Sequence, residues 1–342
     1  MPDAYISQFS GEEIDSTLRA AQMISGASTP AELRKKLEIR GDTIPVSAED
    51  STLISDALTK IPTTSGGGVN PNLLDNWYFG RPVNQRGQTE YTGNATYSID
   101  RWWTQYETTL SIVDGGIKIG GKWDVQQYFE NTLPNATYTL SLLYKDRTGS
   151  DPLRLIAGNR TDGNLAQTES KDASGILSVT FSTAKSNKVN FGFTGSTDNS
   201  AIIIAIKLEL GDTQTLAHKE NGVWVLNEIP DFGEQLRRCQ RYCRVIGGTN
   251  NQPFCNAVRR EATKLEGFIP IDNSFRTAPS ISVNGYFSVI PDFHSVKFTS
   301  GDTLSPQGVS LFFERNDGGT FDKDAYLIYA GADTRIILSA DL

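Results

Sequence analysis

The stretch Asn72-Leu-Leu-Asp-Asn-Trp-Tyr-Phe-Gly-Arg-Pro-Val-Asn-Gln-Arg-Gly87 sets three consecutive aromatic residues among asparagines, glycines and a proline. Ser98-Ile-Asp-Arg-Trp-Trp103 follows it closely. Neither a helix face, which repeats apolar residues every three or four positions, nor a catalytic motif requires this combination. The residues that surround the stretch therefore have to decide its role.

The residues that follow support a β domain, because their apolar side chains recur with a period of two. The flexible linker Thr63-Thr-Ser-Gly-Gly-Gly68 precedes this region. The alternating runs lie at 138–144, 177–181, 189–193 and 202–210, with Gly, Asn and Asp turns between them. This pattern predicts an antiparallel, jelly-roll-like β-sandwich over residues 70–211. In its last run the predicted inward positions are Ile202, Ile204, Ile206, Leu208 and Leu210.

The N-terminal region has a helical pattern instead. Ser10-Gly-Glu-Glu13 is a capping box, and further helix starts occur at Thr29 and Ser47. None of these helices is long enough to be stable alone in water. Residues 1–69 are thus predicted to form either a small helical subdomain or an attachment and trimerisation segment, followed by the linker.

Residues 212–246 are predicted to be a connector that contains a helix. Asp231-Phe-Gly-Glu234 caps this helix, Phe232, Leu236, Cys239 and Cys243 form its apolar face, and Gly247-Gly248 end it. Candidate strands follow at 280–287, 293–298, 308–314, 325–330 and 334–339. They predict a second β-sandwich over residues 247–342. The predicted fold class is therefore mainly β, with short N-terminal helices and two antiparallel sandwiches.

Charge and hydropathy exclude several classes of function. The chain of 342 residues has 32 Lys and Arg against 40 Asp and Glu, a net charge of −8, which argues against a nucleic-acid-binding protein. No apolar run approaches the roughly 20 residues of a membrane span, and the N-terminus lacks the pattern of a signal peptide. We expect synthesis in the cytoplasm and no membrane insertion.

Motifs for catalysis, cofactors and metals are missing from the sequence. The glycine clusters fit neither a P-loop nor a dinucleotide fingerprint, and no nucleophile–histidine–acid context is recognisable. The three cysteines and two histidines lack zinc-like spacing, so we predict buried free thiols. The acidic strings 146–151 and 316–324 could offer oxygen ligands to calcium, but hairpin turns are the more frequent role of such strings. We predict a protein that is not an enzyme and holds no cofactor.

Three segments, in this order, resemble proteins of tailed-phage and prophage tail fibres. They are 73–87 with 99–102; Lys207-Leu-Glu-Leu-Gly211 leading to 232–242; and Phe275-Arg-Thr-Ala-Pro-Ser280. The start at Tyr5–Asp15 is also similar to phage tail N-termini. Cys243 departs from the family, which often has an aromatic residue there.

This resemblance implies a receptor-binding or tail-fibre protein of the virion, in which the stretch 72–87 is the entry strand of a β-sandwich. Such a protein would be a homotrimer that attaches to the tail or baseplate through its N-terminal segment. Its carbohydrate-binding-module-like β domains would recognise the host by binding glycan on the bacterial cell surface. The alternatives are a polysaccharide-degrading enzyme or its carbohydrate-binding subunit, and a baseplate or tail spacer without a ligand.

Aromatic side chains are the first candidates for contact with a sugar, because a flat ring stacks on the apolar face of a pyranose. Adjacent residues of a strand point to opposite faces, so Trp102 and Trp103 cannot both face the core. We predict that Trp103 is the outer one and that Tyr106 and Trp123 accompany it in a carbohydrate-binding site.

Overall fold

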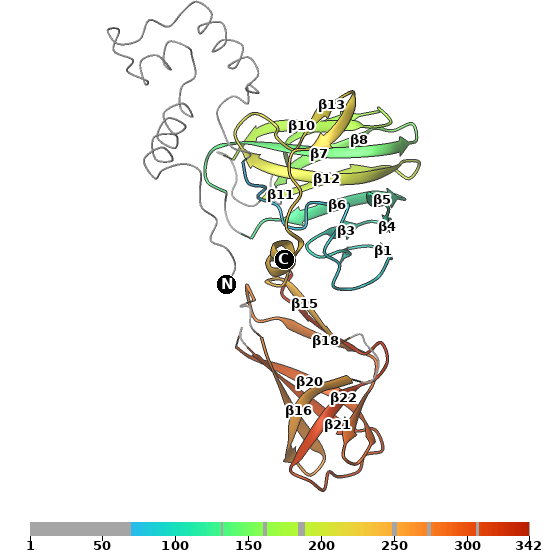
Figure 1. Cartoon of the computed structure of the whole chain (residues 1–342), viewed down its shortest axis with the longest axis vertical. Coiled ribbons are helices and arrows are strands. Elements are labelled where there is room, and N and C mark those ends of the chain that lie inside the picture. Colours follow the sequence, from blue (N-terminus) through green and yellow to red (C-terminus); the bar gives the residue numbers. More distant parts are fainter. Residues whose placement is uncertain are drawn as a thin grey trace, which may run out of the picture. The chain divides into compact units, whose positions relative to one another are not determined.

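A computed structural model describes residues 70–130, 133–159, 163–183, 189–247, 252–271, 275–305 and 308–341. The helices expected within residues 1–69 lie outside these described residues. Antiparallel strands dominate the described part of the chain, and α4 (Phe232–Cys239) is its one α-helix (Figure 1). The predicted mainly β fold class is confirmed.

The first sheet of the sandwich has the strand order β1-β4-β5-β12-β7-β10, and every neighbouring pair is antiparallel. Its strands are β1 (Glu90–Gly93), β4 (Thr108–Val113), β5 (Gly116–Gly120), β7 (Thr137–Thr148), β10 (Gly175–Ser182) and β12 (Ser200–Leu210).

The second sheet has the order β2-β3-β6-β11-β8-β9 and is also antiparallel throughout. Its strands are β2 (Thr96–Tyr97), β3 (Trp103–Gln105), β6 (Trp123–Tyr128), β8 (Leu153–Asn159), β9 (Gly163–Ser170) and β11 (Val189–Gly195). The core lies between the two sheets, where Trp102 packs against Phe79 and Phe193 with ring centroids 5.2 and 6.0 Å apart.

The opening stretch lies along the edge of β12 that β5 leaves free. β5 pairs only with residues 201–203 of β12. Further along that edge, Leu73 N donates to Leu208 O at 2.9 Å and Ile206 N donates to Trp77 O at 3.0 Å. The pairing is irregular, with a single bridge between Tyr78 and Ala205. The stretch therefore completes the first sheet, although it does not form a regular strand.

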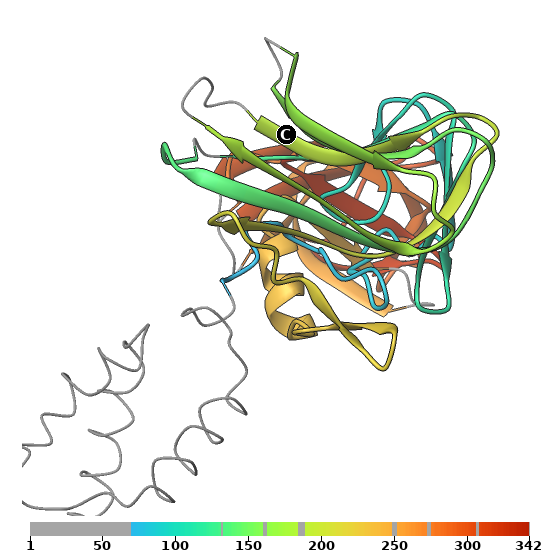
Figure 2. The same ribbon diagram turned by 90° about the horizontal axis from the view of Figure 1, so that it is seen from above.

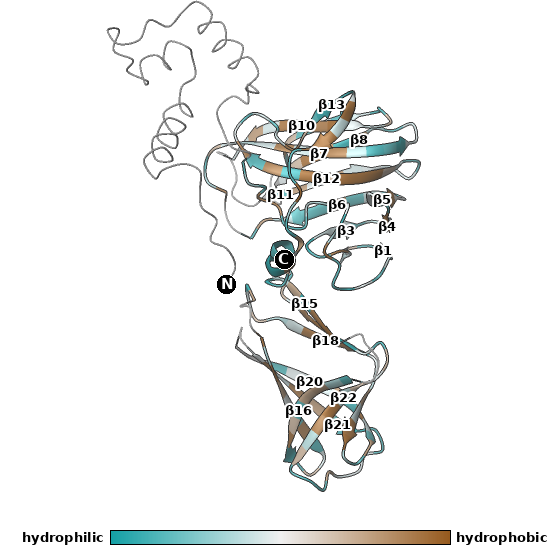
Figure 3. Cartoon of the chain, viewed as in Figure 1, coloured by the Kyte–Doolittle hydropathy of each residue, from teal (hydrophilic) through white to brown (hydrophobic). Residues whose placement is uncertain are grey.

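A bulge in β12 overturns part of the predicted inward face. The pairing of β12 with β7 shifts between Ile203 and Ala205. Because a bulge inserts one residue, side chains before and after it lie on opposite phases. Ile206 and Leu208 are buried as predicted, but Ile203 is fully buried where Ile202 and Ile204 are half-buried, and Leu210 is 51% exposed. Figure 3 colours most of β12 as hydrophobic and α4 as hydrophilic.

The connector consists of a hairpin and a helix. The hairpin pairs β13 (Ala217–Glu220) with β14 (Val223–Leu226). Helix α4 comes next along the chain, as Figure 2 shows. Asp231 caps α4 as predicted, its Oδ1 accepting a hydrogen bond of 2.8 Å from Glu234 N. The helix ends at Cys239, however, and not at Gly247-Gly248.

The predicted apolar face of α4 is also corrected. Its buried residues are Gln235 and Cys239, because Gln235 Oε1 accepts a 2.7 Å hydrogen bond from Asn76 N. Cys243 begins a strand instead of continuing the helix, since β-branched residues follow at 245 and 246. All three cysteines are free and buried, as the sequence predicted.

The C-terminal strands form two structures. β15 (Cys243–Gly247), β23 (Arg335–Ser339) and β18 (Ser280–Asn284) make a three-stranded sheet in the order β15-β23-β18. The others close into a barrel in the order β16-β17-β21-β20-β19-β22. Its strands are β16 (Gln252–Glu261), β17 (Lys264–Pro270), β19 (Phe287–Ile290), β20 (His294–Ser305), β21 (Gly308–Arg315) and β22 (Ala325–Ala330).

The antiparallel β class predicted for residues 247–342 is confirmed, but six of the strands close into a barrel and do not form the predicted sandwich. Closure needs β16, which pairs with both β17 and β22 and was not among the predicted strands. Its inward residues, Cys255 and Ala257, are small, and its outward residues are mostly polar, so its alternation is faint in the sequence. None of the described helices is long and apolar enough to cross a membrane.

Candidate carbohydrate-binding face

The second sheet presents one face to the core and the other to solvent. On β6 the side chains of Trp123, Val125 and Gln127 are buried, and those between them are half-buried. The same alternation runs through β3, β11 and β8. The outward side chains are those of Trp103, Gln105, Asp124, Gln126, Tyr128, Asn190, Thr194, Arg154 and Ile156. We name this set the outer face of the second sheet.

Trp102 and Trp103 divide between the two faces as predicted. Trp102 is fully buried, and its Nε1 donates a 2.8 Å hydrogen bond to Asn76 O. Trp103 is half-buried on the outer face, where its ring lies 5.7 Å from that of Tyr128 at an interplanar angle of 54°. The pair gives this face two aromatic surfaces inclined to each other.

Polar side chains beside this aromatic pair are hydrogen-bonded to one another. Asn190 Nδ2 donates to Gln126 Oε1, and Gln126 Nε2 donates to Asp124 Oδ2 at 2.6 Å. Asn190 lies opposite Tyr128, and Trp103 lies opposite Gln126. The bonds fix the orientation of two amides and a carboxylate, whose remaining donors and acceptors are available to hydroxyl groups.

Asp124 has an altered acidity at this position. Burial raises its pKa to about 6, and the hydrogen bond from Gln126 offsets part of the rise. The carboxylate is therefore ionised at neutral pH and accepts hydrogen bonds only, whereas below about pH 6 it carries a proton and can donate.

A glycine occupies the middle of the outer face. Gly192 lies opposite Gln126 on one side and Ile156 on the other. A Cβ atom added here would come within 2.2 Å of Val125 O, so the close approach of the backbones requires glycine. No side chain therefore rises between the amide of Gln126 and the neighbouring strand.

Tyr106 lies beyond the end of β3 and not on the sheet. Its ring is 41% exposed, its φ is 62°, and Lys122 Nζ lies 4.6 Å from the ring centroid. Asn94 Oδ1 accepts a 3.0 Å hydrogen bond from Tyr106 N and holds the turn. Tyr106 is accessible, but the structure gives it no contact with Trp103.

Trp123 was predicted to join Trp103 in the site, and its placement contradicts this. Trp123 is 0% exposed and packs on Phe193 with ring centroids 6.1 Å apart. A Cβ atom added at Gly195 would meet the Trp123 ring at 2.3 Å, so the glycine makes room for the buried ring. Position 123 shares the inward phase with Val125, and this phase turns the indole to the core.

Tyr128, Gln126 and Asn190 belong to the outer face but were not predicted as site residues. The alternation of Trp123-Asp-Val-Gln-Gln-Tyr128 already sets Asp124, Gln126 and Tyr128 opposite the apolar pair, so it offered a signal. The polar Gln127 obscured this phase. It is 1% exposed because its amide bonds both N and O of Asp75, at 2.8 and 2.7 Å. No comparable signal marks Asn190, which lies on a different strand, β11.

Within the described residues, no group of three or more His, Cys, Asp and Glu side chains is arranged to hold a metal ion. The second acidic string, 316–324, forms a turn: Arg315 Nη2 lies 2.6 Å from Asp317 Oδ2, and Gly319 N donates to Asp317 Oδ1 at 3.0 Å. These bonds occupy the carboxylate of Asp317 and give the string a structural role.

No family model and no curated protein matches this chain. Solved structures do match. A carbohydrate-binding module described under "CBM4 structure and function" is 17% identical, with 32% of this chain and 95% of that chain covered and a TM-score of 0.26.

Two further solved structures are similar. The N-terminal cellulose-binding domain of β-1,4-glucanase C from Cellulomonas fimi is 16% identical over 33% of this chain and 90% of that chain, with a TM-score of 0.25. The N-terminal CBM22-1–CBM22-2 tandem domain of Xyn10C from Paenibacillus barcinonensis is 11% identical over 80% of this chain and 99% of that chain, with a TM-score of 0.30. These neighbours are carbohydrate-binding modules, and none of the three is a phage tail protein.

Proposed function

We propose that this protein binds a glycan, without chemistry, on the outer face of its second sheet. The observation that carries the proposal is the Trp103–Tyr128 pair, which borders the hydrogen-bonded side chains of Asn190, Gln126 and Asp124. Aromatic surface beside fixed amides and a carboxylate matches a sugar ring, which has an apolar face and a rim of hydroxyl groups.

The polar groups are arranged for recognition more than for hydrolysis. Glycoside hydrolysis uses a pair of carboxyl groups about 5 to 10 Å apart on either side of the bond that breaks. Asp124 is the one carboxyl group among the outer-face residues defined above, and its bonded neighbour is an amide. A lone carboxylate in an amide setting favours binding over catalysis.

A glycan array with the labelled full-length chain tests this proposal. We expect Trp103→Ala and Tyr128→Ala each to weaken binding about fivefold or more, because each removes about 1 kcal/mol of stacking. Phe293→Ala is the matched control, since its ring is 76% exposed in the C-terminal block. Circular dichroism establishes that all variants are folded. Equal binding by the wild type and both outer-face variants would rule out this face.

The role within a virion is a second, finer proposal. Its support is the order of the sequence segments that resemble tail-fibre proteins, together with the amphipathic pattern predicted for residues 1–69. We propose a homotrimeric tail-fibre or receptor-binding protein that joins the tail or baseplate through this segment and binds bacterial surface glycan. Light scattering on the purified chain tests the trimer, and a stable monomer in dilute solution contradicts it.

The competing role is that of a carbohydrate-binding component in polysaccharide degradation. It uses the same outer face but predicts a different pattern of ligands. A tail protein binds intact host bacteria, whereas a degradative component binds isolated polysaccharide and acts beside a catalytic domain. Labelled protein mixed with intact cells and with purified plant and bacterial polysaccharides separates the two. A spacer without a ligand would bind none of them.

A further inference from the structure

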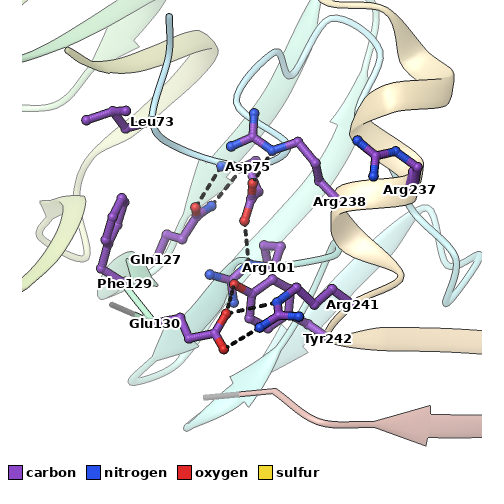
Figure 4. A pocket seen from close by; sticks show the side chains of 10 residues that line it. All are labelled: Leu73, Asp75, Arg101, Gln127, Phe129, Glu130, Arg237, Arg238, Arg241 and Tyr242. Atoms are coloured by element: carbon purple, nitrogen blue, oxygen red, sulfur yellow. Dashed lines mark hydrogen bonds and ion pairs between the residues drawn. The ribbon is translucent and has the colours of Figure 1, made fainter. Parts of the chain in front are cut away.

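A cavity of about 410 Å³ opens where the opening stretch, β6 and α4 meet. Its lining, drawn in Figure 4, comprises Leu73, Asp75, Arg101, Gln127, Phe129, Glu130, Arg237, Arg238, Arg241 and Tyr242. Pockets for small organic ligands have volumes of about 300 to 1,000 Å³, so this cavity exceeds the needs of a bare ion.

The charges that line the cavity do not cancel. Four guanidinium groups face two carboxylates, which leaves an excess of two positive charges. The C-terminal end of α4 contributes a partial negative charge of about half a unit, which is smaller than this excess. The cavity remains positive, although the whole chain has a net charge of −8.

Asp75 is already occupied by two of the arginines. Arg101 Nε lies 3.1 Å from Asp75 Oδ2, and Arg238 Nε lies 2.7 Å from Asp75 Oδ1. Both bonds use Nε, the inner nitrogen of the guanidinium fork. Each oxygen of this carboxylate therefore already has one guanidinium partner.

Glu130 is occupied in the same way. Arg241 donates from Nε and Nη2 to its two oxygens at 3.0 and 2.8 Å, and Tyr242 OH donates to Oε2 at 2.9 Å. These bonds keep the pKa of Glu130 below its usual value. Glu130 and Arg241 therefore neutralise each other. The excess positive charge of the cavity comes from its other arginines.

Arg237 is the cation with the weakest partner. Its nearest carboxylate is Glu234 at 4.0 Å, and both side chains are more than 60% exposed, at 68% and 61%. An exposed ion pair at this distance contributes little in water. Arg237 and the outer nitrogens of Arg238 are the groups that an incoming anion meets.

Apolar groups form the rest of the lining. Leu73 and Phe129 are half-buried, and the Tyr242 ring carries the Arg101 guanidinium 3.5 Å from its centroid. Phe129 is held edge-on against Phe191, with ring centroids 5.9 Å apart at 88°. A ligand in the cavity therefore meets positive charge from α4 and apolar surface from the sandwich.

We propose that this cavity binds a small organic anion, in which Arg237 and Arg238 hold a carboxylate, sulfate or phosphate group and Leu73 and Phe129 contact its ring or carbon frame. The guanidinium fork matches the paired oxygens of such groups. Because the cavity joins the sandwich to α4, a bound anion also braces that junction. None of the lining residues belongs to the outer face proposed above for glycan binding.

Isothermal titration of the full-length chain with D-glucuronate tests the proposal, with D-glucose as the neutral counterpart and inorganic phosphate as the bare ion. We expect glucuronate to bind and glucose not to bind. Arg237→Gln and Arg238→Gln should each weaken glucuronate about tenfold or more, since each removes a charged hydrogen bond. The affinity should also fall as salt is added.

Arg260→Gln is the matched control, because Arg260 is a 55% exposed arginine of the barrel that pairs with Glu266. It should bind glucuronate as the wild type does, and so should Trp103→Ala, whose change lies on the outer face. The proposal is overturned if glucuronate does not bind, if Arg237→Gln binds it as the wild type does, or if phosphate alone binds as tightly as glucuronate.

Discussion

Gln85 Nε2 donates a 2.7 Å hydrogen bond to the main-chain oxygen of Cys243, which lies 158 residues further along the chain. The same amide reaches Asp100 Oδ1 at 3.1 Å, and Gln85 N donates to Asp100 Oδ2 at 2.6 Å. One side chain of the opening stretch therefore ties the sandwich to the first residue of β15.

Replacing Gln85 should destabilise the contact between the sandwich and β15. We expect Gln85→Ala to lower the free energy of unfolding by about 1 to 3 kcal/mol, because it removes two part-buried hydrogen bonds and leaves the Cys243 oxygen unpaired. Urea unfolding measures the change. Gln88→Ala is the control, since Gln88 is exposed and its hydrogen bonds to Asn84 and Tyr91 use main-chain atoms. Equal stability of the two variants would show that the tie contributes nothing.

Asp100 gives the stability of the protein a particular dependence on pH. Burial raises its pKa to about 6, although the charge of Arg86 and the bonds from Gln85 offset part of the rise. The folded state thus binds a proton more tightly than the unfolded chain, whose aspartates titrate near pH 4. The stabilisation of the folded state by the protonated Asp100 is complete below about pH 4 and is lost as the pH rises through about 6.

We therefore expect the free energy of unfolding to fall through the contribution of Asp100 as the pH rises from about 4 to 6. Asp100→Asn should flatten the slope of unfolding free energy against pH. Asp124, whose pKa burial also raises to about 6, acts in the same direction, so Asp100→Asn/Asp124→Asn should flatten it further. Urea unfolding at several pH values gives the slopes. Asp114→Asn, at an exposed position, serves as the control. A slope unchanged in the double variant would contradict the assignment.

Trp103 and Trp123, which the sequence predicted to share one site, should behave differently when replaced. Trp123→Ala should lower the free energy of unfolding by about 3 to 5 kcal/mol, because it empties a fully buried site beside Phe193. Trp103→Ala should lower it by much less and act mainly on glycan binding. Thermal unfolding and the glycan array, run on the same preparations, separate the effects. A strongly destabilised Trp103→Ala would place that ring in the core.

The cysteine thiols should resist labelling in the folded protein. Burial raises the pKa of Cys243 and of Cys255 to about 12 and raises that of Cys239 as well. Few thiolates therefore form at neutral pH, and none is readily reached. We expect negligible reaction with a disulfide reagent in buffer and full reaction of all three thiols in urea. Rapid labelling of one thiol in buffer would show a local opening at that residue.

Much of the sandwich could be predicted from the sequence because its evidence is local. The alternation of apolar residues predicted β7, β10, β11 and β12, and the adjacency of Trp102 and Trp103 predicted that they face opposite sides. The cap at Asp231 was equally clear, since it involves residues three positions apart. Each of these inferences needs only the geometry of a few neighbouring residues.

The candidate site could be predicted only in part. Trp103 follows from alternation, but Asn190 joins Gln126 across a gap of 64 residues and depends on the pairing of β6 with β11. Which residues of β12 face the core depends on a bulge that its uninterrupted apolar run does not reveal. Closure of the barrel depends on the pairing of β16 with β22. Register and bulges are long-range choices that the alternation of a single strand does not encode.

The sequence by itself determined that this chain builds antiparallel sheets, which aromatic residue of the 102–103 pair turns outward, and that its thiols stay free. Only the tertiary structure decided that Trp123 belongs to the core and that the C-terminal strands close into a barrel. It also decided that Asp75, Arg101, Glu130 and Arg238 meet around one cavity. The reason is physical: side-chain direction is a property of the local backbone, whereas a site made from distant segments exists only after those segments have packed together.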